Sequence, residues 1–203
     1  KGIMFGWVRR LISRGQYRRT LTKINNALKL APQQAQLWQE RALLHAHYGH
    51  VAQAVQDLHY AIAADPTDPS AYISLGILYS KQNDLPSAVE HFSKAIKVDP
   101  TGVDGYYNRG NSYFMQGNYQ AAIQDYTRLL TIQPREVAVY AVRSLAYERA
   151  GNLPSAIADC ERFLQYAPTV RHEVTSQKRT QVPEECPKLC SQSRRALLAT
   201  AGY

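Results

Sequence analysis

The chain has 203 residues, of which 45% are hydrophobic and 20% charged, and this composition is typical of globular proteins rather than of disordered chains. No apolar run approaches the roughly 18–20 residues that a membrane-spanning helix needs. The net charge of +8 is concentrated at the ends, because residues 1–34 hold eight Lys/Arg and no acid, whereas residues 35–170 hold ten basic and thirteen acidic residues.

The beginning of the chain is apolar and then strongly basic. Residues 2–8 form a short apolar stretch, and Arg9 and Arg10 follow it at once. A secretory signal places its charge before the apolar stretch, so this segment does not predict export. Because the chain begins at Lys1 rather than at a methionine, we expect it to be part of a longer protein. Its three cysteines are too few for a disulfide framework and favour an intracellular, cytoplasmic location.

Five prolines follow one another at equal intervals of 34 residues. They are Pro32, Pro66, Pro100, Pro134 and Pro168. Cutting the chain shortly after each proline gives five units that align without a gap, and these are 1–34, 35–68, 69–102, 103–136 and 137–170. Regular spacing over this length predicts a repeat protein in which each unit is one supersecondary element.

Each unit is predicted to hold two helices joined by a tight turn. Apolar residues recur at helical spacing in the first half of a unit, as at Tyr72, Leu75 and Leu78. The second helix is expected to end near the repeated proline, which cannot continue a helix. A Gly or Asn at the midpoint supplies the left-handed backbone that closes the first helix. These midpoint residues are Gly15, Gly49, Asn83, Gly117 and Gly151.

Small residues mark the places where the two helices of a unit approach closely. Ala88 and Ala122 each lie twelve residues before their proline, and Gly76 and Gly110 lie in the first helices of the same units. One helix pair cannot bury its own apolar faces, so neighbouring units must stack to complete the core. The sequence therefore predicts an all-α solenoid, with Asp68 as the N-cap of the helix that follows it.

Unit 103–136 closely resembles the tetratricopeptide repeat. The residues that carry the resemblance are Tyr106, Gly110, Tyr113, Gly117, Ala122, Tyr126 and Pro134. It is strong over residues 35–170, although the fifth unit departs from it at a few positions, and it is weak over 1–34; units at the ends of an array are expected to be atypical. The resemblance implies a right-handed solenoid of five repeats that has no catalytic activity and binds another protein, within a larger complex.

In this family the first helices of the units line a concave groove that holds a partner peptide or helix. On that pattern the middle and later parts of the groove are apolar here, which suits the apolar face of an amphipathic helix. Ile73, Tyr107 and Phe114 have an alternative role, which is to pack between neighbouring units. The residues predicted to line the groove are Leu43, Ile73, Ile77, Tyr107, Asn108, Asn111, Phe114, Val142 and Leu145.

Two specialised members of the family do not fit this sequence. One subclass holds the acidic tails of chaperones with lysine and arginine side chains, and the corresponding positions here supply no such set of cations. Another holds peptide backbone with a row of asparagines, of which only Asn108 is present at the equivalent positions. The sequence therefore argues against a chaperone clamp.

Two other functions stay open at this stage. The basic first unit, with Arg18, Arg19 and Lys23, would favour an anionic partner such as a nucleic acid or an acidic protein surface. No RNA-binding motif accompanies these cations, which argues against nucleic acid. The chain would alternatively be the regulatory repeat region of a larger enzyme. The sequence itself holds no glycine-rich phosphate loop and neither of the common hydrolase motifs.

We expect neither a metal nor a cofactor. His45, His47 and His50 lie close together in the sequence, but His45 takes the position of Tyr79 in the next unit and should point into its helix pair. Cys160 replaces a core aromatic residue and is predicted to be an inert buried thiol. Residues 171–203 break the period, and we predict an irregular tail with a short helix over 191–200.

Overall fold

The structure is a computed structural model that describes residues 14–173, with side chains described for residues 15–166. Within this range the chain forms helices and no strands, which confirms the predicted all-α repeat solenoid. The predicted short helix over 191–200 lies outside the described residues. The helices are α1 (Arg14–Leu30), α2 (Ala35–His47), α3 (Val51–Ala64), α4 (Pro69–Lys81), α5 (Leu85–Val98), α6 (Val103–Met115), α7 (Tyr119–Ile132), α8 (Val137–Arg149) and α9 (Leu153–Glu173).

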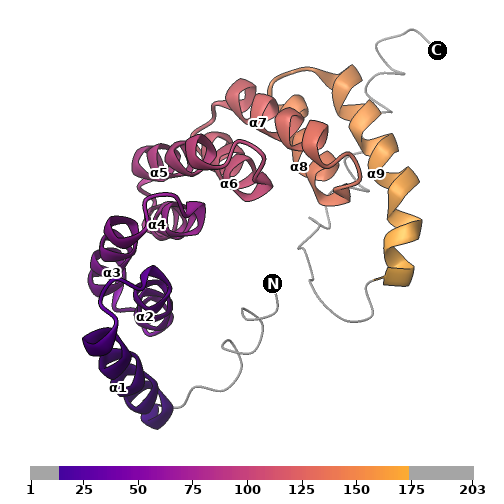
Figure 1. Cartoon of the computed structure of the whole chain (residues 1–203). Coiled ribbons are helices and arrows are strands. Elements are labelled where there is room, and N and C mark those ends of the chain that lie inside the picture. Colours follow the sequence, from indigo (N-terminus) through magenta and orange to yellow (C-terminus); the bar gives the residue numbers. More distant parts are fainter. Residues whose placement is uncertain (1–13, 174–203) are drawn as a thin grey trace, which may run out of the picture.

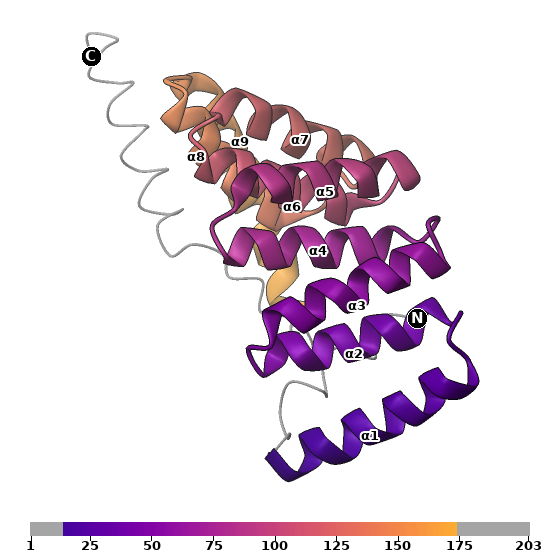
Figure 2. The same ribbon diagram turned by 90° about the vertical axis from the view of Figure 1, so that its left-hand side faces the viewer.

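The helices stack in chain order along a curved arc. Figure 1 shows α2, α4, α6 and α8 along the inner side of the arc, with α3, α5 and α7 on the outer side. Viewed from the side in Figure 2, successive helices lie one above another, with α1 at one end. The most extensive contacts join the two helices of one unit, such as α2 with α3 and α4 with α5. The arc therefore presents the first helix of each complete pair on its concave side.

The predicted turns between paired helices have the expected backbone geometry. Gly49, Gly117 and Gly151 have φ angles of 79°, 78° and 78°, and Asn83 has a φ angle of 62°. This left-handed conformation costs little for glycine and is tolerated by asparagine better than by most residues. The repeated Gly or Asn is thus explained by the turn that separates the two helices of a unit.

The prediction of a turn at Gly15 is wrong. Gly15 lies inside the first turn of α1, which runs without interruption from Arg14 to Leu30. The first amide groups of a helix have no intrahelical acceptor, and the low helix propensity of glycine matters less there than in a helix interior. The pattern of Tyr17, Leu21 and Leu28 then continues at helical spacing along the rest of α1.

The expectation that a helix ends at each repeated proline is wrong at Pro168. Helix α9 continues beyond residue 170 and ends at Glu173. At the other repeated prolines the chain turns into the first helix of a further unit, whereas α9 is the last helix of the described range. Proline within a helix removes one backbone hydrogen bond and crowds the preceding turn, which disfavours a continuing helix without excluding it.

Side chains cap some of the helices, whereas α2, α3, α6 and α8 have no side-chain cap. The carboxylate of Asp68 accepts a hydrogen bond from the Ser70 amide at 2.9 Å, which confirms the predicted N-cap of α4. Asp84 accepts from the Ser87 amide at 3.2 Å at the start of α5. Such caps are worth about 1 kcal/mol each, because they satisfy amide groups that the helix itself leaves without a partner.

The repeated prolines and the repeated aromatic residues bond to each other. The indole N–H of Trp38 donates to the carbonyl oxygen of Pro32 at 2.8 Å. The hydroxyl groups of three tyrosines donate in the same way to the carbonyls of the prolines that precede their units. These pairs are Tyr72 with Pro66 at 3.4 Å, Tyr106 with Pro100 at 3.2 Å, and Tyr140 with Pro134 at 3.0 Å. Each bond ties the first helix of one unit to the end of the preceding unit.

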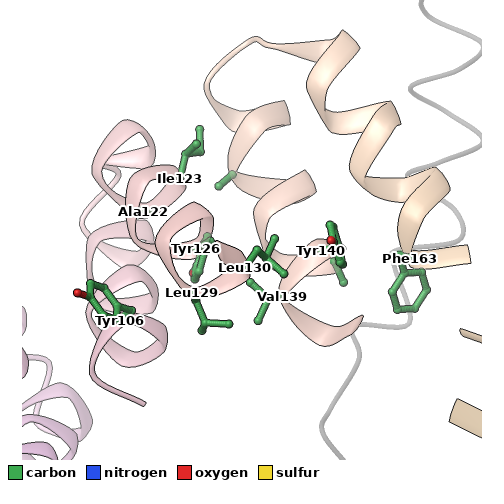
Figure 3. Packing of buried hydrophobic residues seen from close by; sticks show 11 residues of the cluster. Tyr106, Ala122, Ile123, Tyr126, Leu129, Leu130, Val139, Tyr140 and Phe163 are labelled. Carbon is green, nitrogen blue, oxygen red and sulfur yellow. The ribbon is translucent and has the colours of Figure 1, made fainter. Parts of the chain in front are cut away.

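Close packing explains the recurring small residues. A Cβ atom on Gly76 would lie 2.5 Å from the ring of Phe92, and one on Gly110 would lie 2.7 Å from the ring of Tyr126. Ala122 is completely buried. Figure 3 shows this packing in the later units, where Tyr126, Leu129 and Val139 meet between α7 and α8. The core therefore passes from one unit to the next, as stacking requires.

Candidate functional site

The predicted groove residues all lie on the four inner helices of the arc (Figure 1). None of them is fully buried. On α4, for example, Leu75 and Leu78 are buried, whereas Ile73 and Ile77 are only half-buried, one helical turn apart. Helix α4 therefore has apolar residues both on its packed face and on its partly exposed face.

Four of the predicted residues contribute accessible apolar surface that the hydrophobic core clusters of the described chain do not include. Leu43 is 42% exposed, and Ile73, Ile77 and Leu145 are half-buried. Leu43, Ile77 and Leu145 occupy the same position of their units. We call these three residues the inner apolar row. In the fourth unit the equivalent position holds the polar residue Asn111, which interrupts the row.

The other predicted residues have structural contacts of their own. Tyr107, Phe114 and Val142 pack against the core cluster of the later units. The ring of Phe114 also meets that of Tyr119 edge-on, with centroids 5.3 Å apart. Asn108 donates a hydrogen bond from its side chain to the carbonyl of Asp104, one turn earlier in α6, at 2.8 Å. These residues therefore have a packing or hydrogen-bonding role in addition to the surface that they expose on the inner face.

Asn111 on the inner side is explained by the buried hydroxyl of Tyr126, which requires a hydrogen-bond acceptor. The hydroxyl of Tyr126 donates a hydrogen bond to Asn111 Oδ1 at 2.7 Å, and Tyr126 is only 1% exposed. Burial raises the pKa of Tyr126, so this hydroxyl keeps its proton and remains a donor. In the other complete units the residues that replace Tyr126 are Leu58, Phe92 and Cys160, and apolar residues replace Asn111.

The second unit joins the third through a polar cluster between α2 and α4. The side-chain amide of Gln39 donates to Asp68 Oδ2 at 2.6 Å. In return the hydroxyl of Ser70 donates to Gln39 Oε1 at 2.9 Å. These groups bond to each other, so this part of the junction is polar and internally satisfied. Apolar binding surface is therefore expected elsewhere on the inner helices.

Three arginines form partly buried cross-links that the sequence analysis missed. Each lies on the first helix of a unit and bonds through two nitrogens to an aspartate sixteen residues later on the second helix. The pairs are Arg41 with Asp57, Arg109 with Asp125, and Arg143 with Asp159, with bonds of 2.6–2.8 Å. Bidentate geometry of this kind gives the strongest carboxylate hydrogen bonds. The signal was available, since both residue types recur at multiples of 34.

The same arginines also reach the preceding unit. Nη1 of Arg109 donates to the hydroxyl of Ser93 at 2.9 Å, and Nη1 of Arg143 donates to that of Thr127 at 2.9 Å. Arg41 makes the equivalent bond to Asn25 Oδ1 at 2.8 Å. We call each of these three-residue networks a strut, because it joins three helices from two units.

Aromatic rings and charge hold the struts in place. The guanidinium carbon of Arg109 lies 6.0 Å from the ring centroids of both Tyr106 and Tyr113, within range for cation–π attraction. The hydrogen bond with Asp125 raises the pKa of Arg109, so the guanidinium group stays charged at any physiological pH. A buried pair of this kind specifies which residues meet, although its net contribution to stability is modest.

The third unit has no strut at the same place. Leu75 and His91 replace the arginine and the aspartate, and both are buried. Nδ1 of His91 lies 2.8 Å from the carbonyl oxygen of Ser87, and its ring stacks on Tyr79 with centroids 5.1 Å apart. Burial of apolar and aromatic surface therefore replaces a directional polar link at this position.

Histidine, cysteine and carboxylate side chains do not form a metal site in the described part of the chain, where no group of three or more is suitably placed. His45 lies in its helix pair as expected, with Nδ1 3.3 Å from the hydroxyl of Tyr17 and Nε2 3.8 Å from Asp57 Oδ2. Burial lowers the pKa of His45. Cys160 is buried, as predicted.

The basic first unit is represented in the structure by α1. Arg18, Arg19 and Lys23 are exposed along it, while Ile24 and Leu28 are buried against α2. Arg9 and Arg10 lie outside the described residues. A search of the described helices for a stretch long and apolar enough to cross a membrane found none.

Family models match the sequence from residue 9 to residue 136 without a gap. Tetratricopeptide-repeat models match residues 9–74, 60–90 and 103–136, and a TPR-repeat model matches residues 78–117. A search of the curated proteins gave no match. The fold and the sequence pattern therefore point to one family.

Solved structures of similar fold are repeat proteins of low sequence identity. The crystal structure of MamA is 22% identical, covers 78% of this chain and 93% of its own, and superposes with a TM-score of 0.71. YrrB, described as a TPR protein with an unusual peptide-binding site, is 14% identical with a TM-score of 0.64, over 76% of this chain and 79% of its own. The first TPR of Spaghetti (RPAP3), bound to an HSP90 peptide, is 18% identical with a TM-score of 0.56, over 59% of this chain and 97% of its own.

Proposed function

Because the chain belongs to the tetratricopeptide-repeat family, whose members are generally protein-interaction scaffolds, we propose that it binds an apolar segment of another protein on its inner face. Two of the similar structures, YrrB and the first TPR of RPAP3, are described as peptide-binding proteins. Proteins of this family and fold are typically scaffolds rather than enzymes. For this chain we propose in addition which face binds the partner, the inner one, and what kind of segment the partner supplies, an apolar one.

The inner apolar row is the observation that carries the proposal. Leu43, Ile77 and Leu145 leave apolar surface accessible on three of the four inner helices. Burying such side chains against a partner contributes roughly 25 cal/mol for each Å² of apolar area. An amphipathic helix suits the row, because its anchors at i, i+3 or i+4, and i+7 present apolar side chains at regular steps along one face.

Site-specific cross-linking tests this proposal. A photo-reactive amino acid replaces Ile77, and in a matched control it replaces Tyr60, which is 45% exposed on α3. We expect cross-linking at position 77 to capture a partner segment whose apolar residues recur at helical spacing. Equal capture at position 60, or a captured segment without apolar periodicity, would contradict the proposal.

A further inference from the structure

A second concavity lies between α7 and α9, on a different face of α8 from the inner residues Val142 and Leu145. It is an open depression of about 410 Å³, a size in the range of small-ligand sites. We call it the α7–α9 depression. Its lining includes Thr127, Leu130, Pro134, Arg143, Ser155 and Arg162.

The strut of the fifth unit forms part of this depression. Arg143 uses one N–H on each of its three nitrogens to bond Asp159 and Thr127. A guanidinium group has five N–H donors, so one remains on each terminal nitrogen. The side chain of Arg143 is 14% exposed, and the rings of Tyr140 and Tyr147 flank it with centroids 5.7 Å from its guanidinium carbon. The arginine is therefore held rigidly with part of its donor capacity unused.

Arg162 makes the depression cationic. Arg143 and Asp159 neutralise each other, whereas Arg162 is exposed and forms no ion pair with any residue of the described chain. Arg128 and Arg135 follow the lining residues Thr127 and Pro134 in the sequence and are exposed, but they are not part of the lining. Arg162 is thus the one cation of the lining that has no carboxylate partner among the described residues.

We propose that the α7–α9 depression binds a carboxylate side chain of an acidic peptide segment from another protein. Arg162 supplies the ion pair, and the remaining N–H groups of Arg143 and the hydroxyl of Ser155 supply hydrogen bonds. Leu130 and Pro134 provide apolar contact for the methylene groups of a glutamate. The segment is distinct from the apolar one bound on the inner face.

A carboxylate fits this site better than a nucleic-acid backbone does. A phosphate backbone carries closely spaced charges and is held by a continuous series of cations. Here Asp159 lies within the depression, and Glu161 is exposed on α9 next to Arg162. A single carboxylate can bind the planar guanidinium group of Arg162, whereas an extended phosphate backbone would also be repelled by these two acids.

Titration of the full chain with a short acetylated oligoglutamate peptide tests the site, with an oligoglutamine peptide of equal length as the neutral control. We expect saturable changes in the amide resonances of Thr127, Ser155 and Arg162 with oligoglutamate alone. The apparent affinity should fall as sodium chloride is raised, because exposed charges are screened. Arg162→Gln should weaken binding about tenfold, since it removes the ion pair while leaving a surface residue that the fold does not need.

Lys94→Gln is the matched control. Lys94 occupies the position of Arg162 in the third unit, but it already pairs with Glu90 at 2.7 Å, and Leu75 replaces the arginine of the strut there. This variant should bind oligoglutamate as the wild type does. The proposal is overturned if no saturable binding occurs, if Arg162→Gln binds equally well, or if inorganic phosphate or a single-stranded oligonucleotide binds this site in preference to oligoglutamate.

Discussion

The third and fourth units have the same backbone architecture but join their neighbours differently. In the fourth unit the strut links Arg109 to Asp125 and to Ser93 of the preceding unit. In the third unit Leu75 and His91 occupy the equivalent positions, and Leu75 is completely buried. A directional polar link and an apolar contact therefore serve the same place in the repeat. The stack therefore needs this volume filled, whereas the chemistry that fills it varies between units.

The same two units also differ on the inner face, for a reason that lies in their cores. Tyr126 places a hydroxyl in the core of the fourth unit, and Asn111 satisfies it from the inner side. Phe92 has no hydroxyl, and the equivalent inner residue of the third unit is Ile77. The choice of one core aromatic thus decides whether an inner position is polar or is available to the inner apolar row.

Removing one member of a strut should have the largest effect. Asp125→Ala leaves the partly buried Arg109 without its carboxylate partner and should cost about 3 kcal/mol of unfolding free energy. The equivalent change in the third unit, His91→Ala, removes no ionic partner and should cost only about 1 kcal/mol. Urea denaturation followed by circular dichroism measures both. Equal losses in the two variants would show that the polar strut and the apolar contact do not differ energetically.

Enlarging the small residue between paired helices should affect both units alike. Ala88 and Ala122 are completely buried in the third and fourth units. Substituting leucine at either site overpacks the helix pair and should cost about 2 kcal/mol in the same denaturation experiment. Gln124→Leu, at an exposed position of α7, is the control and should change stability by less than about 0.5 kcal/mol. A loss below that level at both alanines would contradict the assigned interior.

Placing the core residues of the third unit in the fourth should cost less stability. The first substitution should destabilise the fold, and the second should restore it. Asn111→Ile alone leaves the buried hydroxyl of Tyr126 without its acceptor and should cost about 1.5 kcal/mol. Adding Tyr126→Phe removes the hydroxyl and should restore stability to within about 0.5 kcal/mol of the wild type. A double-mutant cycle measures this coupling. Simple additivity of the two changes would mean that the hydroxyl does not dictate Asn111.

The smallest effect is expected from pH at the second unit. Burial lowers the pKa of His45 in the folded state, so the unfolded chain takes up this proton more readily. Stability should therefore decrease as the pH falls from about 7 to about 5, through the unfolded value of about 6.5. His45→Tyr introduces the residue found at the equivalent positions 79 and 113 and should reduce this dependence. If His45→Tyr shows the same difference in unfolding free energy between pH 7 and pH 5 as the wild type, His45 is not the source of the pH dependence.

Much of the fold could be predicted because its determinants are local and regular. The spacing of Pro66 and Pro100 marks the units, and the turn residues Asn83 and Gly117 mark the helix boundaries. The struts were missed because Leu75 and His91 interrupt their repetition and because the bonds join three helices. The sequence does not decide between the two roles of Tyr107, since only the stacked structure shows how much of an inner side chain a neighbouring unit covers.

The central claim is that a partner segment binds on the inner apolar row. Its most direct test is to measure the affinity of the chain for the segment captured by cross-linking at position 77. We predict that Ile77→Asn and Leu145→Asn each weaken binding of that segment about tenfold, through the loss of buried apolar area. Leu164→Asn, which alters a residue 48% exposed on α9, should leave the affinity unchanged. Unaltered binding by both inner variants, with the fold intact, would show that the partner does not use the inner apolar row.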